Sequence, residues 1–109
     1  MKVGFIDQTQ WPLFAPLLLP IVIKALEHGD AVAVLGLTED DVACGAAAYY
    51  MEGNRLEVIS FYVAPDYRGR GGGTLLLTTL ARLARKGDDL KPVSVHIIRG
   101  GSAGNIILR

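Results

Sequence analysis

The stretch from Leu56 to Lys86 constrains the fold of this chain more than any other part of the sequence. It begins as an apolar strand, passes Pro65 and a glycine-dense loop, Arg68–Gly73, and ends in a leucine-rich helix. Backbone N–H groups at the N-terminus of a helix bind phosphate anions, because unpaired donors and the helix dipole both favour negative charge there. This order of elements therefore predicts that the chain binds a phosphate-bearing cofactor.

Length, charge and cysteine content narrow the class of protein. The 109 residues, 50% of them hydrophobic, suit a single domain, 1–109, with one core. Eleven basic and eleven acidic residues give no net charge, which argues against a surface for nucleic acid or an anionic membrane. The one cysteine, Cys44, has no partner for an internal disulfide, so we expect a cytoplasmic protein. Prolines interrupt the apolar run 11–23, which is shorter than the roughly 20 residues of a membrane span, so we expect no signal peptide or anchor.

Apolar periodicity and turn residues predict an α/β (α+β) fold with a mixed, mostly antiparallel sheet flanked by helices. A proline in mid-helix costs about 3 kcal/mol, so Pro16 and Pro20 divide the early helical region in two. Gly53-Asn54 is a hairpin signal, and Gly29 and Gly87 suit helix C-caps. The crossover through the last helix is long enough to join parallel strands. The predicted strands are 2–6, 31–38, 42–51, 55–63 and 92–98, and the predicted helices are 12–18, 20–28 and 74–86.

Several known glycine-rich motifs are alternative interpretations of this loop. A Walker A loop ends in Gly-Lys-Ser/Thr, but here Gly73 precedes Thr74 with no lysine. A dinucleotide fingerprint fits Gly69 and Gly71, but Thr74 holds the third glycine position and the strand lies in a meander. An arginine-glycine RNA tract would be repeated and disordered, whereas this loop is single and leads into an amphipathic helix. A glycine-rich turn without a ligand stays open as an alternative.

The segment Val63–Gly73 resembles the acetyl-CoA loop of the GNAT acetyltransferases. The pattern of that family is V-x-P, two residues, then Q/R-x-x-G-x-G/A, and Arg68, Gly71 and Gly73 occupy its defining positions. The resemblance extends over about residues 1–98. It implies an N-acetyltransferase that moves an acetyl group from acetyl-CoA to a primary amine of a small molecule or peptide by direct attack, without a metal, nucleic acid or membrane.

The resemblance also implies where acetyl-CoA (CoA) binds. The strand before the loop would splay from its neighbour, and the backbone of Phe61 and Val63 would pair with the pantetheine arm. An N–H group near Val63 would polarise the thioester carbonyl. Gly71 and Gly73 allow a pyrophosphate to approach the backbone, whereas the arginines either add charge or are solvated. The candidate loop residues are Arg68, Gly69, Arg70, Gly71, Gly72, Gly73 and Thr74.

Glu57 is the candidate general base, since its position matches the catalytic glutamate of histone-acetylating relatives. Simple strand alternation places it with Ile59, Phe61 and Val63, and these apolar neighbours are expected to raise its pKa. The alternative is a structural glutamate paired with Arg55 or solvent. Other candidate residues have simpler roles. We expect Tyr49, Tyr50 and Tyr62 to be core or groove-lining aromatics. His96 is expected to be a structural histidine, and Cys44 a packed core thiol.

The tail 99–109 departs from the family pattern, and we leave its structure open. A complete GNAT domain continues with a helix, which usually carries the tyrosine that protonates the thiolate, and two strands. No tyrosine follows Tyr67 here, and the C-terminal part of the domain looks shortened. The strand 92–98 would then lie at an exposed sheet edge. The chain is a fragment, or a half-domain that binds CoA without turnover, or it pairs with a second copy through 106–108. We favour the dimer, and a CoA-binding or assembly module that needs a second chain is the alternative function.

Overall fold

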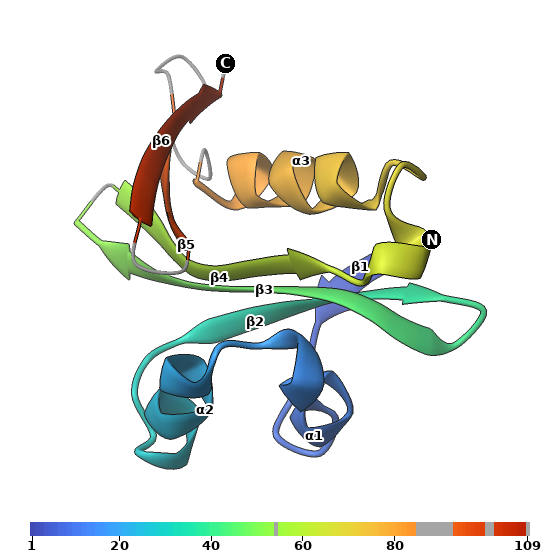
Figure 1. Cartoon of the computed structure of the whole chain (residues 1–109). Helices are drawn as coiled ribbons and strands as arrows, with labels where there is room; N and C mark the ends of the chain where they lie inside the picture. The colour runs from blue at the N-terminus through green and yellow to red at the C-terminus, as the bar shows by residue number, and fades with distance from the viewer. Residues whose placement is uncertain (54, 85–92, 100–101, 109) are drawn as a thin grey trace.

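One six-stranded sheet, with its strands in sequence order, forms the centre of the molecule (Figure 1). The computed structural model describes residues 1–53, 55–84, 93–99 and 102–108. The strands are β1 (Lys2–Phe5), β2 (Ala33–Glu39), β3 (Val42–Glu52), β4 (Arg55–Val63), β5 (Val93–Arg99) and β6 (Ser102–Leu108). The helices are α1 (Trp11–Phe14), the 3₁₀ turn η1 (Ala15–Leu17), α2 (Pro20–Glu27), the 3₁₀ turn η2 (Pro65–Tyr67) and α3 (Gly72–Ala84).

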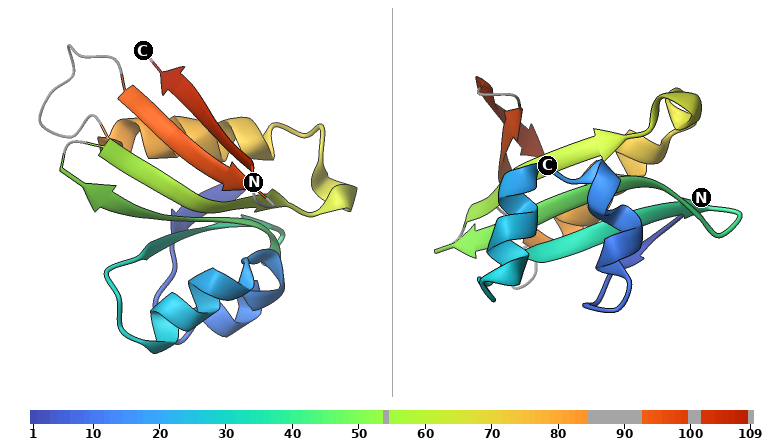
Figure 2. Two further views of the ribbon diagram at one scale, coloured as in Figure 1. Left: turned by 60° about the vertical axis from the view of Figure 1, so that its left-hand side comes forward. Right: turned by 60° about the horizontal axis from the view of Figure 1, so that its bottom comes forward.

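The sheet is mixed, as predicted. Strands β4 and β5 run parallel, and every other neighbouring pair is antiparallel. Helix α3 covers one face of the sheet, and α1 and α2 cover the other (Figures 1 and 2). We refer to these as the α3 face and the α1/α2 face.

Strand β6 overturns the expectation that β5 forms an exposed edge. Every residue of β6 pairs with β5 in the same chain, from Arg99↔Ser102 to Val93↔Leu108. Residues 106–108 therefore extend this sheet instead of joining a second copy.

The prolines shape the α1/α2 face. The predicted helix 12–18 is a short α-helix followed by a 3₁₀ turn that contains Pro16, whereas Pro20 is the first residue of α2. Proline fits the first turn of a helix because its missing N–H would have no partner there. Gly29 follows α2 with φ +77°, and its N–H donates to the Leu26 carbonyl, as expected of a C-cap.

The β-hairpins follow local turn chemistry. Glu39 pairs with Val42 around Asp40 and Asp41, which both have positive φ, and Glu52 pairs with Arg55 after Gly53 at φ +61°. Positive φ is what two-residue hairpin turns demand. Asn54 and the predicted end of the last helix, with Gly87, lie outside the described residues.

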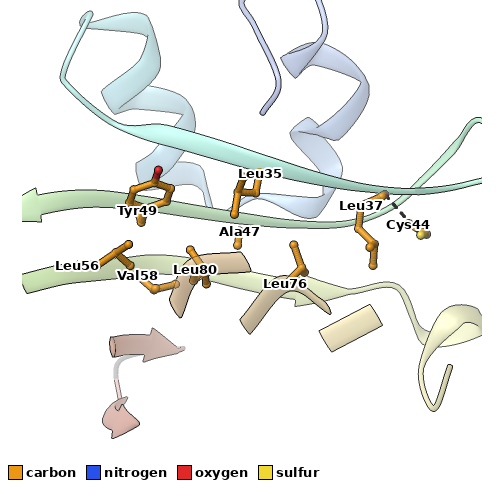
Figure 3. Packing of buried hydrophobic residues seen from close by; sticks show 9 residues of the cluster. All are labelled: Leu35, Leu37, Cys44, Ala47, Tyr49, Leu56, Val58, Leu76 and Leu80. Carbon is orange, nitrogen blue, oxygen red and sulfur yellow. Dashed lines mark hydrogen bonds between the residues drawn. The ribbon is translucent and has the colours of Figure 1, made fainter. Parts of the chain in front are cut away.

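The two faces of the sheet carry separate cores. On the α3 face, side chains of the helix meet those of three strands (Figure 3), and the cluster is Leu35, Leu37, Cys44, Ala47, Tyr49, Leu56, Val58, Leu76 and Leu80. On the α1/α2 face the cluster is Phe14, Leu18, Val22, Val34, Ala46 and Ala48. A Cβ atom at Gly36 would lie 2.6 Å from the Phe14 ring, so this glycine lets α1 approach the sheet. Among the described helices, none is long and apolar enough to cross a membrane.

Candidate functional site

The N-terminus of α3 presents backbone donors next to the glycine loop. The Leu75 N–H donates to the Gly71 carbonyl at 3.0 Å, which makes Gly71 the residue before the helix. The N–H groups of Gly72, Gly73 and Thr74 have no acceptor within the part of the chain that the structure describes, as is usual in a first helical turn. Gly69 and Gly71 have φ of +78° and +85°, a conformation that strains other residues. The backbone of the predicted phosphate loop thus converges on an unpaired helix end.

The adjacent glycines Gly72 and Gly73 serve different purposes. A Cβ atom at Gly72 would lie 2.6 Å from Leu37 Cδ2 and 3.2 Å from Met1 Sδ, so this glycine allows α3 to pack on the sheet. A Cβ atom at Gly73 would meet only Phe61 Cε1, at an ordinary 4.0 Å. The fold therefore needs a glycine at 72, whereas the space beside Gly73 is open to a ligand.

Both loop arginines are held by protein groups. Arg68 Nε donates to the Val63 carbonyl at 2.8 Å, and its guanidinium lies 5.3 Å from the centre of the Tyr62 ring. The Arg70 guanidinium lies 5.3 Å from the centre of the Tyr67 ring. Cation–π contacts of this kind stabilise a cation over an aromatic face. They place two positive charges on the loop that precedes α3.

Strand β4 parts from β5 before it reaches the glycine loop. The described pairing of the two strands includes Leu56, Glu57 and Val58, whereas β4 continues to Val63 in register with β3 (Figure 1). This confirms the predicted splay of the strand. The segment of β4 beyond Val58 leads directly into η2 and the loop.

A β-bulge in β4 sets the face of the sheet on which each of its side chains lies. Tyr49 of β3 pairs with Val58 while Ala48 pairs with Ser60, so Ile59 is an extra residue. As a result, Leu56, Val58, Phe61 and Val63 belong to the α3 face. Residues 57, 59, 60 and 62 belong to the α1/α2 face. The predicted neighbours of Glu57 were wrong in part. Glu57 shares a face of the sheet with Ile59, but Phe61 and Val63 lie on the other face.

Glu57 is buried and has a charged neighbour. Its side chain is 6% exposed, and its Oε1 lies 3.3 Å from a guanidinium nitrogen of Arg55, which is itself 64% exposed. Arg55 also lies 3.9 Å from Glu52. Of the three apolar neighbours expected, Ile59 shares the face of Glu57, and the alternative pairing with Arg55 is confirmed. The register sets the backbone of His96 in β5 opposite Glu57, but the His96 side chain lies outside the described residues.

A cavity of about 270 Å³ adjoins the end of β4 on the α1/α2 face. The Ser60 hydroxyl, 1% exposed, accepts a 3.2 Å hydrogen bond from the Leu19 N–H, which fixes the corner before α2. Sequence reasoning missed Ser60, although a lone hydroxyl in the apolar strand was a usable signal. The cavity is lined by Pro16, Leu17, Leu18, Leu19, Ser60, Phe61 and Tyr62. A second cavity, of about 380 Å³, lies between β1 and α1 and includes Phe5 and Leu13.

Tyr49 and Cys44 take the structural roles expected of them. Burial raises the pKa of the Tyr49 hydroxyl, and the ring belongs to the core. Burial, with a smaller contribution from Glu39, raises the pKa of the Cys44 thiol, whose Sγ donates weakly to the Leu37 carbonyl at 3.5 Å (Figure 3). Tyr50 is half-buried, and Tyr62 lies at the cavity under Arg68.

Comparison with known proteins agrees with this geometry. Residues 4–100 match the model of the acetyltransferase (GNAT) family. A ribosomal-protein-alanine N-acetyltransferase from Brucella melitensis biovar Abortus has a TM-score of 0.66 and 22% identity, over 91% of this chain and 81% of that one. An aminoglycoside 6'-N-acetyltransferase from Acinetobacter haemolyticus has a TM-score of 0.69 and 13% identity, over 92% and 80%. The PaiA N-acetyltransferase from Thermoplasma acidophilum, in complex with coenzyme A, has a TM-score of 0.60 and 14% identity, over 94% and 83%. No curated protein matches the sequence significantly.

Proposed function

This chain belongs to the GNAT family of acetyltransferases, and from that premise we propose that it transfers an acetyl group from acetyl-CoA to a primary amine of a small molecule or peptide. One observation carries the proposal: β4 diverges from β5 after Val58 and leads straight into a glycine loop at the N-terminus of α3. An extended, anion-bearing ligand fits along such a path, with its anionic part at the helix end.

The residues at the helix end suit the pyrophosphate of CoA. The N–H groups of Gly72, Gly73 and Thr74 have no acceptor among the described residues, and the space beside Gly73 is open. Arg68 and Arg70 add positive charge, although Arg68 is also tied to the end of β4. Hydrogen bonds from charged or dipole-aligned donors are the strong ones in anion binding.

On the strand, Phe61 and Val63 would accompany the pantetheine arm. Acetyl-CoA supplies the thioester carbonyl that the amine attacks. A backbone N–H near Val63 would stabilise the negative charge that develops on the carbonyl oxygen. Because Arg68 Nε binds the Val63 carbonyl, the loop and the end of the strand are held in one arrangement. Positioning of this kind lowers the entropic cost of the reaction.

Glu57 is the proposed base. By strand alternation it lies on the α1/α2 face with Ser60 and Tyr62, the face on which the 270 Å³ cavity opens. Ser60 is three residues further on, which is roughly 10 Å along a strand. At that range Glu57 would receive the proton of the amine through water. Arg55 would stabilise the negative carboxylate at 3.3 Å.

Titration with CoA and an assay of CoA release test the proposal. The expected result is saturable CoA binding, and amine-dependent release of CoA thiol from acetyl-CoA. A thiol reagent can follow the release, since Cys44 is buried. Absence of CoA binding by the folded protein would overturn the proposal.

In a second candidate function the Arg55–Glu57 ion pair is purely structural, and the chain is a CoA-binding or assembly module that needs a second chain. In this case CoA would raise the melting temperature, but no amine would release it. Scattering in solution would then show whether two copies associate. A cytoplasmic location, expected from the sequence, forms part of these proposals, as does a dimer, although not one formed through the β5 edge, which β6 covers.

A further inference from the structure

We infer that the 270 Å³ cavity beside Ser60 selects the acceptor, and that it takes an amine carrying a neutral, apolar group about the size of an aromatic ring. The inference rests on the proposed function, since it names the acceptor class of that site.

The position of the cavity follows from the bulge at Ile59. The extra residue turns Ser60 and Tyr62 toward α1 and α2, while Val63 stays on the α3 face with the glycine loop, and Phe61, which packs against the α3-face cluster, also borders the cavity. The cofactor loop and the cavity therefore lie on opposite faces of the same strand end. A group held in the cavity would bring an attached amine to the end of β4 from the side away from the loop.

The lining of the cavity identifies the chemistry of its occupant. None of its described lining residues is charged, and the polar side chains among them are those of Ser60 and Tyr62. Ser60 already accepts the Leu19 N–H. The nearby carboxylate on this face, Glu57, is paired with Arg55. The cavity opens to solvent at Pro16, Leu19 and Tyr62, so a second charge on the acceptor would lose part of its hydration there and find no opposite charge in the lining.

The size and rigidity of the cavity set the size of the group. An apolar protein cavity of about 150 Å³ is enough to bind benzene. The cavity here measures about 270 Å³ and opens to solvent beside Leu19 and Tyr62, so it has room to hold one face of a ring with the linker leading outward. The Leu19–Ser60 hydrogen bond and the Arg68–Tyr62 contact fix two of its walls. Pre-formed apolar sites of this kind bind without a large ordering cost.

Titration of the CoA-saturated protein with two amines of different charge tests the inference. We expect 2-phenylethylamine to bind at least about tenfold more tightly than 1,4-diaminobutane, because one apolar contact in a pocket is worth that much. Leu19→Asp should reverse the order by adding an anion to the lining. Leu19 is the N-cap of α2 at φ −66° and ψ 147°, with no side-chain cap, so aspartate is well suited to the position and the variant should fold.

The matched control is Leu13→Asp, a second leucine-to-aspartate change at an exposed site away from this cavity. It should leave the preference for 2-phenylethylamine unchanged. Equal or tighter binding of the diamine to the original chain overturns the inference, as does an unchanged preference in folded Leu19→Asp. Those results leave the proposed function standing if CoA binds, whereas failure of CoA to bind overturns both.

Discussion

Replacement of Gly73 by glutamate should strengthen the fold and weaken CoA binding at the same time. The residue is the second of α3, its φ is not positive, and a Cβ atom there meets only Phe61 at 4.0 Å. Glycine is about 1 kcal/mol less favourable than a good helix former. A carboxylate in the first turn adds about 0.3–1 kcal/mol. We therefore expect the free energy of unfolding to increase by about 1 kcal/mol.

The same carboxylate would stand where the pyrophosphate is proposed to bind. Two like charges about 4 Å apart repel by about 1 kcal/mol in water and by about 4 kcal/mol at an effective dielectric constant of 20. Since each 1.4 kcal/mol is a factor of ten, the Kd for CoA should rise between about fivefold and about 700-fold. The increase should shrink as salt is added, because ions screen exposed charges.

Calorimetric titration with CoA and urea unfolding give the two quantities. Gly73→Gln has the same shape without the charge, and it should raise the Kd less. Thr78→Glu places the charge further along the exposed side of α3 and should leave CoA binding unchanged. A folded Gly73→Glu protein that binds CoA as tightly as the original chain would refute the placement of the pyrophosphate at this helix end.

Two further substitutions, a thiol-reactivity assay and a pH profile of stability test the site and the core. Glu57→Gln should lower the rate of CoA release by about 10²–10⁴, the usual contribution of a general base, with the Kd for CoA unchanged; an undiminished rate would exclude Glu57 as the base. Gly72→Ala should cost about 1–3 kcal/mol in urea unfolding, because its methyl group would lie 2.6 Å from Leu37 Cδ2; unchanged stability would show that α3 packs less closely. The Cys44 thiol should react with a thiol reagent only after unfolding. Burial raises the pKa of Cys44 and Tyr49, so as pH rises the unfolded chain loses these protons before the folded chain does. The contribution of the two groups to stability should therefore be complete below their ordinary pKa values, about 8.5 and 10, and should fall as pH rises above them. A flat profile of stability through that range would contradict this.

Local signals in the sequence were enough to predict most of the fold. The hairpin turns at Asp40-Asp41 and after Glu52 depend on residues that accept positive φ, and the helix starts depend on proline at Pro12 and Pro20. The stripe of leucines in α3 was also correct, with Leu76 and Leu80 fully buried. Each of these features is decided by a few neighbouring residues.

Features that depend on distant contacts escaped prediction. Nothing in the sequence around Ile59 marks a bulge, because the extra residue is defined by its register against Ala48 and Tyr49. The different roles of Gly72 and Gly73 depend on Leu37, which lies far away in the sequence. The loop motif therefore predicted the proposed cofactor side of the site, whereas the proposed acceptor side, with Ser60, depends on the packing of α1 and α2 against β4.

The bulge at Ile59 makes β4 sensitive to chain length in a way that differs from its sensitivity to side-chain type. A substitution at this half-buried position changes one contact. Deletion of the residue would restore strict alternation along β4 and rotate everything on one side of it by half a turn. Leu56 and Val58 would then leave the core under α3, or Phe61 and Val63 would leave the cofactor side. Deletion of this one residue would thus put the core side chains and the proposed site side chains of β4 on the wrong faces relative to each other, although all of the proposed site residues would still be present.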